Sequence, residues 1–212
     1  MRKFLRNALL FVPLLALASC GGGGESKPDP YKPSAEEWAA NIERINTGNM
    51  QVSFKMKVAE LGTQVVTMKA TATKVQQEMT VSGMTMTDLI VKDGDNYFSY
   101  SKVTRQDWTK TPSTAEDFAE MKKGLLPLTL DYSNFEWGGS SLKMTNKEPI
   151  VVNMGEETTT FTNVVIAVLD KQITTIDANV TTAHGSETQS GTMQAVYTYK
   201  DASFDIEVPE VE

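Results

Sequence analysis

The sequence contains only one cysteine and one histidine, Cys20 and His184. A single thiol excludes an intrachain disulfide bond, so the hydrophobic core alone must hold the fold together. Zinc sites need three or four converging ligands, and two such residues are too few. A lone His184 in a polar stretch is most simply a solvated side chain. We therefore expect neither a bound metal nor a cofactor.

Motifs of common enzyme classes are missing as well. No Gly-x-Ser-x-Gly elbow, phosphate-binding loop or Gly-x-Gly-x-x-Gly follows a predicted strand. Carboxylates are plentiful, but one sequence does not distinguish a glycosidase pair from surface charge. Asp93, Asp95 and Asn96 around Gly94 are too few for a calcium-chelating loop, and a hairpin turn uses the same residues. We expect that the protein is not an enzyme.

Positive charge is scarce, since 20 Lys and Arg residues stand against 27 Asp and Glu residues. Nucleic acid binding needs clustered Lys and Arg, so the net charge of −7 argues against that partner. The same balance argues against electrostatic adhesion to anionic lipid. Beyond residue 19, no apolar run approaches the roughly 20 residues that a membrane-spanning helix needs. A membrane link must therefore come from another feature of the chain.

The first 20 residues supply that feature. A basic start over residues 2–6 precedes an apolar run over residues 9–17, and Leu-Ala-Ser-Cys then ends at Cys20. The order is that of a secretory signal, and its last four residues resemble the bacterial lipobox. In a lipobox the cysteine is diacylated and the chain is cut just before it. The alternative is an ordinary signal peptide with an incidental cysteine.

An acylated Cys20 is an anchor rather than a catalytic group. Each buried methylene contributes about 0.8 kcal/mol, and stable anchoring takes two or more acyl chains. Four glycines and a polar, Pro-rich stretch follow, which is the composition of a flexible or extended linker. We therefore predict a signal peptide over residues 1–19, a lipidated tether over 20–33 and one domain over 34–212. The protein is expected in the cell envelope, on the outer membrane or the outer face of the cell membrane.

Two helices are predicted in this domain. Residues 34–45 have Trp38, Ile42 and Ile45 at helical spacing, and Ser34 with Glu37 fits a capping box. Residues 111–124 carry a second apolar stripe, with Ser113 and Glu116 as the corresponding cap pair. Both helices are amphipathic and must bury one face.

Strand patterns fill most of the remaining domain. Residues 50–58 alternate strictly between apolar and polar side chains. The parity of the apolar residues changes at Gly83, which suggests a bulge or a sharp bend. Residues 160–169 are apolar enough for a strand buried on both faces, whereas residues 184–191 read as a polar loop. Strands are predicted over residues 50–58, 66–73, 77–81, 89–91, 97–103, 141–145, 150–154, 160–169, 173–182, 194–200 and 203–208.

Many strands joined by short turns indicate an antiparallel sheet. Two amphipathic helices need an apolar surface to pack on. The predicted fold class is therefore α+β, with a strongly curved antiparallel sheet and two helices packed on its concave side.

The order of elements resembles the LolA/LolB superfamily, which includes the LppX/LprG-like lipoproteins. The resemblance rests on the lipobox and tether, the first helix, and the turn KDGDNY at residues 92–97 that leads toward a tryptophan. It continues in VVIAVLDKQITTID at residues 164–177 and in the ending YTYKDASFDIEVPE at residues 197–210. It implies an open half-barrel with the helices as a lid, whose apolar interior holds lipid or acyl chains. Periplasmic carriers of this group lack a lipid anchor, so Cys20 would make this chain a membrane-tethered member.

The residues expected to contact such a ligand come from the first helix and from two strands that face it. Methionine is flexible and polarizable and recurs on adaptable binding surfaces, although the same side chains also fill ordinary cores. The small Ala70 would leave room for a ligand. The predicted contact residues are Trp38, Ile42, Phe54, Met56, Met68 and Ala70.

Two functions remain open at this point. The first is a lipid-binding or lipoprotein-handling module with its ligand between sheet and helices. The second is a surface interaction protein that binds a protein, peptide or glycan and has no internal ligand. A cavity of several hundred cubic ångströms would favour the first, and a core at native packing density the second.

The lipobox predicts that the substitution Cys20→Ala releases the domain from the membrane or leaves the precursor uncleaved, because the acceptor of the acyl chains is gone. Cell fractionation combined with metabolic acyl labelling measures both effects. Unchanged labelling of the variant would contradict the lipobox.

Overall fold

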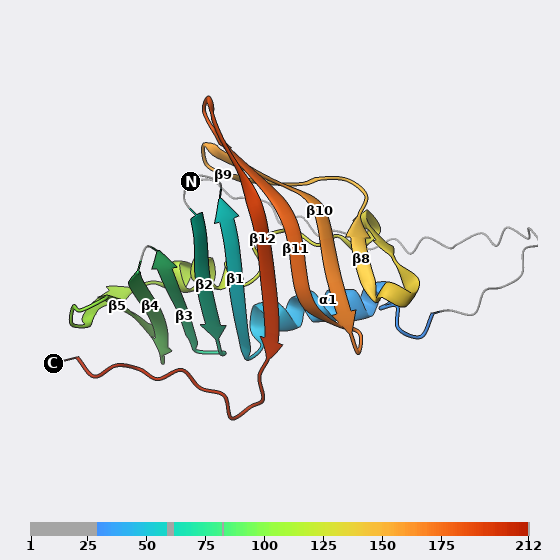
Figure 1. The fold of residues 1–212 in the computed structure, drawn as a ribbon. Helices are drawn as coiled ribbons and strands as arrows, with labels where there is room; N and C mark the ends of the chain where they lie inside the picture. Colours follow the sequence, from blue (N-terminus) through green and yellow to red (C-terminus); the bar gives the residue numbers. More distant parts are fainter. Residues whose placement is uncertain (1–28, 59–61, 82, 212) are drawn as a thin grey trace, which may run out of the picture.

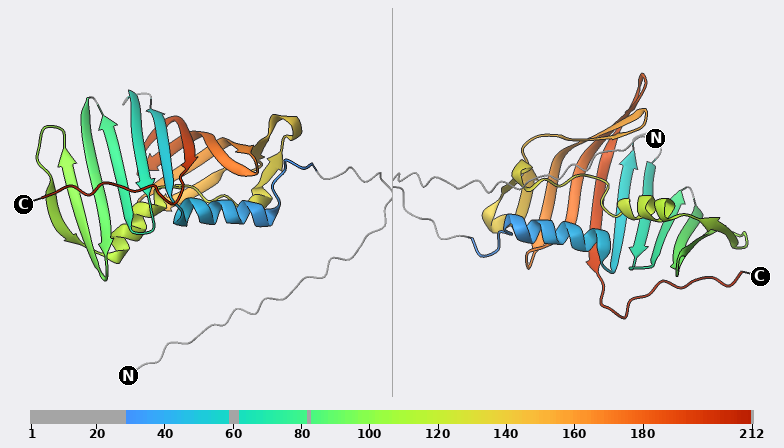
Figure 2. Two further views of the ribbon diagram at one scale, coloured as in Figure 1. Left: turned by 90° about the horizontal axis from the view of Figure 1, so that it is seen from below. Right: turned by 180° about the vertical axis from the view of Figure 1, so that it is seen from behind.

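The structure is a computed structural model that describes residues 29–58, 62–81 and 83–211. Within these residues, twelve strands form one antiparallel sheet, and two α-helices lie end to end across one of its faces (Figures 1 and 2). This confirms the predicted combination of a single antiparallel sheet and two helices. The predicted signal peptide, Cys20 and most of the tether lie outside the described residues.

The sheet is open, with strand order β6-β5-β4-β3-β2-β1-β12-β11-β10-β8-β7 and with β9 paired to β10. Pairing of β1 with β12 joins an N-terminal half to a C-terminal half. The helices are α1 (Ala35–Thr47) and α2 (Ala115–Lys123). The strands are β1 (Met50–Val58), β2 (Gly62–Ala70), β3 (Lys74–Val81), β4 (Met84–Asp93), β5 (Asn96–Val103), β6 (Thr109–Ser113), β7 (Phe135–Trp137), β8 (Lys143–Asn146), β9 (Ile150–Met154), β10 (Glu157–Leu169), β11 (Gln172–His184) and β12 (Glu187–Tyr199), with 3₁₀ turns η1 (Tyr132–Asn134) and η2 (Gly139–Ser141).

Helix α1 begins as predicted. The Ser34 hydroxyl accepts the Glu37 backbone N–H at 3.1 Å, and the Glu37 carboxylate accepts the Ser34 N–H at 2.8 Å. This capping box satisfies two of the backbone donors that a helix start leaves unpaired. Trp38 and Ile45 are buried toward the sheet. Asn41 is buried between them, and the apolar stripe had given no sign of it.

Helix α2 corrects the prediction at its start. Its cap is Thr114, whose hydroxyl accepts the Asp117 N–H at 3.1 Å, rather than Ser113 with Glu116. Residues 109–113 instead form β6, which pairs with β5. A ladder with β5 satisfies the backbone groups that the predicted first turn would have used. Pro112 is tolerated there because β6 is an edge strand.

Two parity changes in the strand pattern have different structural causes. Gly83, expected in a bulge or bend, lies in the β3–β4 hairpin turn with φ of 81°, and Val81 pairs with Met84 across it. In β10 the register shifts between Thr162 and Val165, around Asn163 with φ of 49°. Odd-numbered residues are buried before this bulge and even-numbered residues after it, so the buried side chains stay on one face of the sheet. The strand is therefore buried on one face, not on both as predicted.

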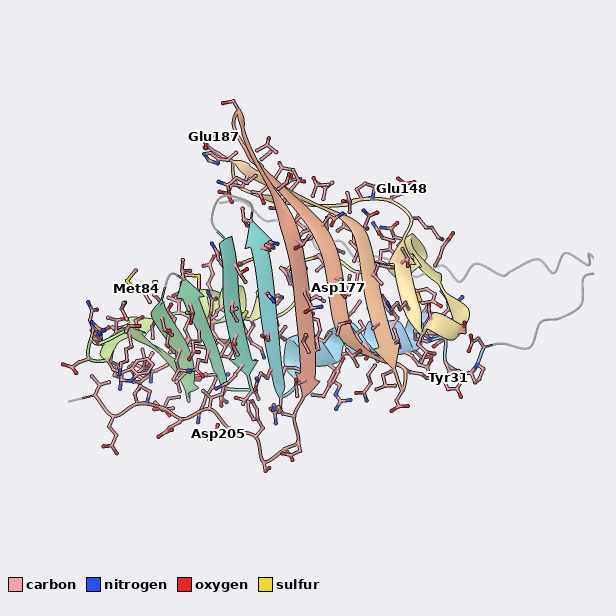
Figure 3. The ribbon with its side chains drawn as sticks, viewed as in Figure 1. Tyr31, Met84, Glu148, Asp177, Glu187 and Asp205 are labelled. Atoms are coloured by element: carbon pink, nitrogen blue, oxygen red, sulfur yellow. The ribbon has the colours of Figure 1, made fainter. Side chains whose placement is uncertain are left out.

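The C-terminal part departs further from the predictions. Residues 184–191, predicted as a polar loop, continue the β11–β12 hairpin beyond the helices, where both faces can be solvated (Figure 1). Residues 203–208 form no strand. They belong to a tail that crosses the sheet on the face opposite the helices, where Ile206 packs against Leu89 and Tyr100. The Lys74 ammonium holds this tail through Asp205 at 2.8 Å (Figure 3).

The main core lies between the helices and the sheet, and Trp38 stands at one end of it. Its indole N–H donates to the Leu130 carbonyl at 2.9 Å, and its ring packs against Tyr132 and Phe135. Through Trp38, α1 is fixed both to the sheet and to the chain segment that follows α2.

Asn41, on the same buried face of α1 as Trp38, binds this helix to the β10–β11 turn. Its amide donates to the carbonyls of Glu37 and Lys171, each at 2.7 Å, and its oxygen accepts the Ile173 N–H at 3.3 Å. Beside it, the exposed Lys171–Glu37 ion pair at 2.6 Å spans the same two elements.

Replacing Asn41 with Ala should therefore destabilise the fold by about 1–3 kcal/mol, because buried backbone groups lose their partners. Urea unfolding measures this change. Asn46→Ala, an exposed position on the same helix, should stay within about 0.5 kcal/mol of wild type. Equal stabilities of the two variants would contradict the role given to Asn41.

Candidate functional site

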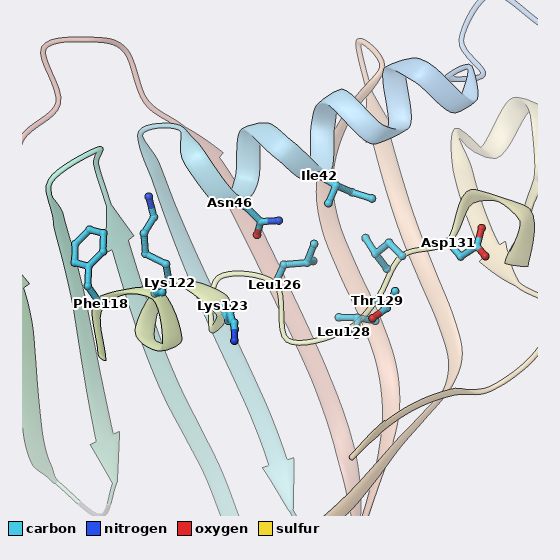
Figure 4. A pocket seen from close by; sticks show the side chains of 11 residues that line it. Ile42, Asn46, Phe118, Lys122, Lys123, Leu126, Leu128, Thr129 and Asp131 are labelled. Carbon is cyan, nitrogen blue, oxygen red and sulfur yellow. The ribbon is translucent and has the colours of Figure 1, made fainter. Parts of the chain in front are cut away.

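The main candidate site is a groove of about 670 Å³ between α1, α2 and the segment of residues 126–131, which we call the connecting segment (Figure 4). This volume lies within the roughly 300–1,000 Å³ that small-molecule sites occupy. The groove is open along one side. Its lining residues are Ile42, Asn46, Phe118, Ala119, Lys122, Lys123, Leu126, Leu128, Thr129, Leu130 and Asp131.

The walls of the groove are held by the core beneath them. Leu128 and Leu130 of the connecting segment are buried, and the Leu130 carbonyl accepts the indole N–H of Trp38. At the end of α2, a Cβ added to Gly124 would stand 3.0 Å from the Met68 side chain. The absence of a side chain there lets the end of α2 lie directly on the sheet. The connecting segment and the C-terminal end of α2 are therefore both in contact with the core.

The lining is apolar along its length and charged at its ends. Ile42, Phe118, Leu126 and Leu128 supply the apolar surface. Lys122 and Lys123 come from the α2 end, and Asp131 lies at the far end of the connecting segment (Figure 4). A groove with this distribution suits a molecule with an apolar body and a polar end.

Lys122 is the unusual charge of this site. Its ammonium donates to the Thr71 carbonyl at 3.3 Å and lies 5.7 Å from the centre of the Phe118 ring. Burial lowers the pKa of this ammonium from its ordinary value. Among the described residues, no carboxylate lies within ion-pair distance of it. The adjacent Lys123, by contrast, is exposed and pairs with Glu120 at 2.5 Å.

The other end of the groove is acidic, because Asp131 lies there. The Asp131 carboxylate accepts the Ser133 backbone N–H and hydroxyl, each at 2.9 Å, and these bonds lower the pKa of Asp131. The two ends of the groove thus carry opposite charges at neutral pH.

The predicted ligand contacts do not gather in this groove, apart from Ile42. Trp38, Phe54, Met68 and Ala70 are buried among other core side chains. Ala70 stands opposite Met50 and Val75 on the neighbouring strands, and its surroundings are filled. Met56 lines a separate hollow of about 90 Å³ near the β11–β12 hairpin. The contact role of these six residues stays a prediction.

The same face of the sheet continues beyond the helices as a Met-rich surface. Phe54, Val66, Met79 and Met86 stand opposite one another across β1 to β4, so they share this face. Phe54 and Val66 are buried, whereas Met86 is 43% exposed. Met84 at the β3–β4 hairpin is 59% exposed (Figure 3).

Five of the eleven groove residues were missed because they lie in the connecting segment, which has no helical or strand period. The one sequence signal is the run Leu-Leu-Pro-Leu-Thr-Leu at residues 125–130, where four leucines lie outside any predicted element. Loops at the surface are usually polar. A leucine-rich irregular segment is therefore expected to pack against the core, where it can form one wall of a groove.

The tether also meets the body close to this site. Residues 29–33, which were assigned to the tether, form a turn in which Asp29 accepts the Trp137 indole N–H at 2.7 Å. The Pro33 carbonyl accepts the Tyr132 hydroxyl at 2.8 Å. The described end of the tether is thus attached beside the start of α1.

No helix within the described ranges is long and apolar enough to span a bilayer. In the same part of the chain, no three Cys, His, Asp or Glu side chains converge as a metal site would require. No model of a known protein family matches the sequence, and a search of curated proteins found no match.

Lys122 should release its proton below the ordinary lysine pKa of 10.5, because burial disfavours the charged form. NMR titration of lysine side chains labelled at Nζ measures this directly. The resonance should return to ordinary behaviour when the protein is unfolded in urea. An ordinary titration in the folded state would contradict the half-buried placement of Lys122.

Proposed function

We propose that this protein is a membrane-anchored, extracytoplasmic bacterial lipoprotein that binds a lipid or another apolar chain in the groove between α1, α2 and the connecting segment. The supporting observation is the groove itself, which has ligand size, an apolar lining and walls fixed by the core. The role is one of binding rather than catalysis. The LolA/LolB-like resemblance, with the helix-bearing face as the concave side of a half-barrel, belongs to this proposal.

The proposed ligand position differs from the one that the sequence suggested. Between the sheet and the helices, the space is taken by side chains such as Trp38, Met50 and Leu125, all of them buried. Because large side chains fill this space, we place the ligand in the groove between the two helices. There it would contact the outer surface of the core, and it could enter from solvent without unfolding the helix layer.

A second function is favoured by the Met-rich surface. Met84 and Met86 expose flexible apolar side chains on the helix-bearing face of the sheet, beyond the helices. Such surfaces adapt to apolar segments of other proteins. On this alternative, the protein is a surface interaction module without a bound lipid, and the groove is only a surface depression.

The substitution Ala119→Trp distinguishes the two. Ala119 is exposed on α2 and lines the groove, so an indole there would occupy the ligand volume without entering the core. Uptake of a fluorescent fatty-acid probe should be abolished, and lipid extracted from the purified protein should disappear from the mass spectrum. Thermal unfolding should be close to wild type, since surface changes stay within about 0.5 kcal/mol.

The matched control is Ala40→Trp, which adds the same side chain at an exposed position of α1 outside the groove lining. This variant should take up the probe as the wild type does. A wild type that binds no probe and carries no lipid would contradict lipid binding and leave the interaction module. Normal uptake by Ala119→Trp would place the binding elsewhere.

A further inference from the structure

The charges at the two ends of the groove carry information about the ligand beyond its apolar body. A ligand of one charge sign is attracted to one end and repelled from the other. The inference drawn from these charges rests on the proposed function, because it concerns the same groove.

The α2 end carries a cation that has no ionic partner within the part of the chain that the structure describes. Lys122 is half-buried, and its described hydrogen-bond acceptor is a neutral backbone carbonyl, that of Thr71. Desolvating a charge without a counter-charge is unfavourable. An anion at this position would offset the cost of desolvation and gain a charge-assisted hydrogen bond.

Helix stability alone does not require this arrangement. A lysine in the last turn of a helix interacts favourably with the C-terminal carbonyls, and that interaction works at the surface. Lys123 already supplies it, with an exposed side chain paired to Glu120. The burial of Lys122 beside Phe118 and the apolar groove is additional to that role.

The far end disfavours an anion. Asp131 is exposed and ionised at neutral pH, and the hydrogen bonds from Ser133 lower its pKa further below the ordinary value. Between the two ends, the lining surface is apolar over Ile42, Leu126 and Leu128. A chain that begins with an anion near Lys122 can therefore run along this surface toward the connecting segment.

We propose that the ligand is an amphiphile with an anionic head group, carboxylate or phosphate, which is held by the Lys122 ammonium while its acyl chain lies along the groove. A carboxylate head group corresponds to a free fatty acid and a phosphate to an anionic lipid. Both offer oxygen acceptors that an ammonium binds. Lys122 is thus the specificity-determining residue of the groove.

The test compares four probes that share one chain: dodecanoate, dodecyl phosphate, neutral dodecyl maltoside and cationic dodecyltrimethylammonium. Isothermal titration below the micelle-forming concentration gives the affinity of each probe for the full domain. At least one of the two anionic probes should bind about tenfold more tightly than the neutral or cationic probe, the expected effect of one charge-assisted hydrogen bond. The tighter of the two anions identifies the head-group class.

Three variants locate the effect. Lys122→Met keeps the apolar stem and should lose the tenfold preference for the anion while binding of the neutral probe is unchanged. Lys122→Arg keeps the charge and should retain most of the preference. Lys143→Met removes a charge from an exposed position outside the groove lining and should behave as wild type.

Three outcomes would overturn the inference. Equal binding of all four probes by the wild type would leave lipid binding standing but refute the anionic head group. An undiminished anion preference in a folded Lys122→Met variant would refute the role of Lys122. Absence of binding by every probe would refute the proposed function itself, and the inference with it.

Discussion

The hydrogen bond from the Trp38 indole to the Leu130 carbonyl is the contact on which the groove depends. It joins α1 to the connecting segment at 2.9 Å, and these are two of the three walls. Trp38 is 2% exposed, so its N–H has no access to bulk water and needs this acceptor. The ring also packs against Phe135 at the opposite end of the sheet from β6. The spacing of the groove walls is thereby tied to the main core.

The third wall depends on a close approach rather than on a polar contact. Gly124 lets α2 end against Met68 of β2, and the Lys122 ammonium reaches the Thr71 carbonyl just beyond the same strand. Helix α2 has no fully buried residue of its own, so these contacts at its C-terminal end position it. Burying few side chains makes α2 the wall that a ligand could displace most easily.

Local signals in the sequence were sufficient wherever neighbouring residues decide the structure. The capping pair Ser34 and Glu37 and the strict alternation over residues 50–58 predicted α1 and β1 correctly. The predicted start of α2 was wrong because residues 109–113 pair with β5 and belong to the sheet. The local cap signal at Ser113 does not reveal this pairing. The predicted strand over residues 203–208 was also wrong. The apolar side chains of this segment pack on the face of the sheet opposite the helices, but its backbone pairs with no strand. The groove could not be predicted, because its connecting segment has no period and takes its position from Trp38.

The same limits apply to the predicted ligand contacts. Alternation showed that Phe54, Met68 and Ala70 face inward, but it could not show whether ligand or protein fills the space they face. In the structure these residues are buried among large side chains, and the groove is the larger open space. Of the six predicted contact residues, Ile42 is the one that lines this groove. Met84 and Met86 remain the competing apolar surface.

Paramagnetic relaxation by a spin-labelled fatty acid separates these two surfaces most directly. In a methyl-labelled sample, the label should broaden the methyl resonances of Ile42, Leu126 and Leu128, which line the groove. The methyl groups of Met84 and Met86 should keep their intensities. Broadening confined to Met84 and Met86, or none at any of these methyl groups, would contradict lipid binding in the groove.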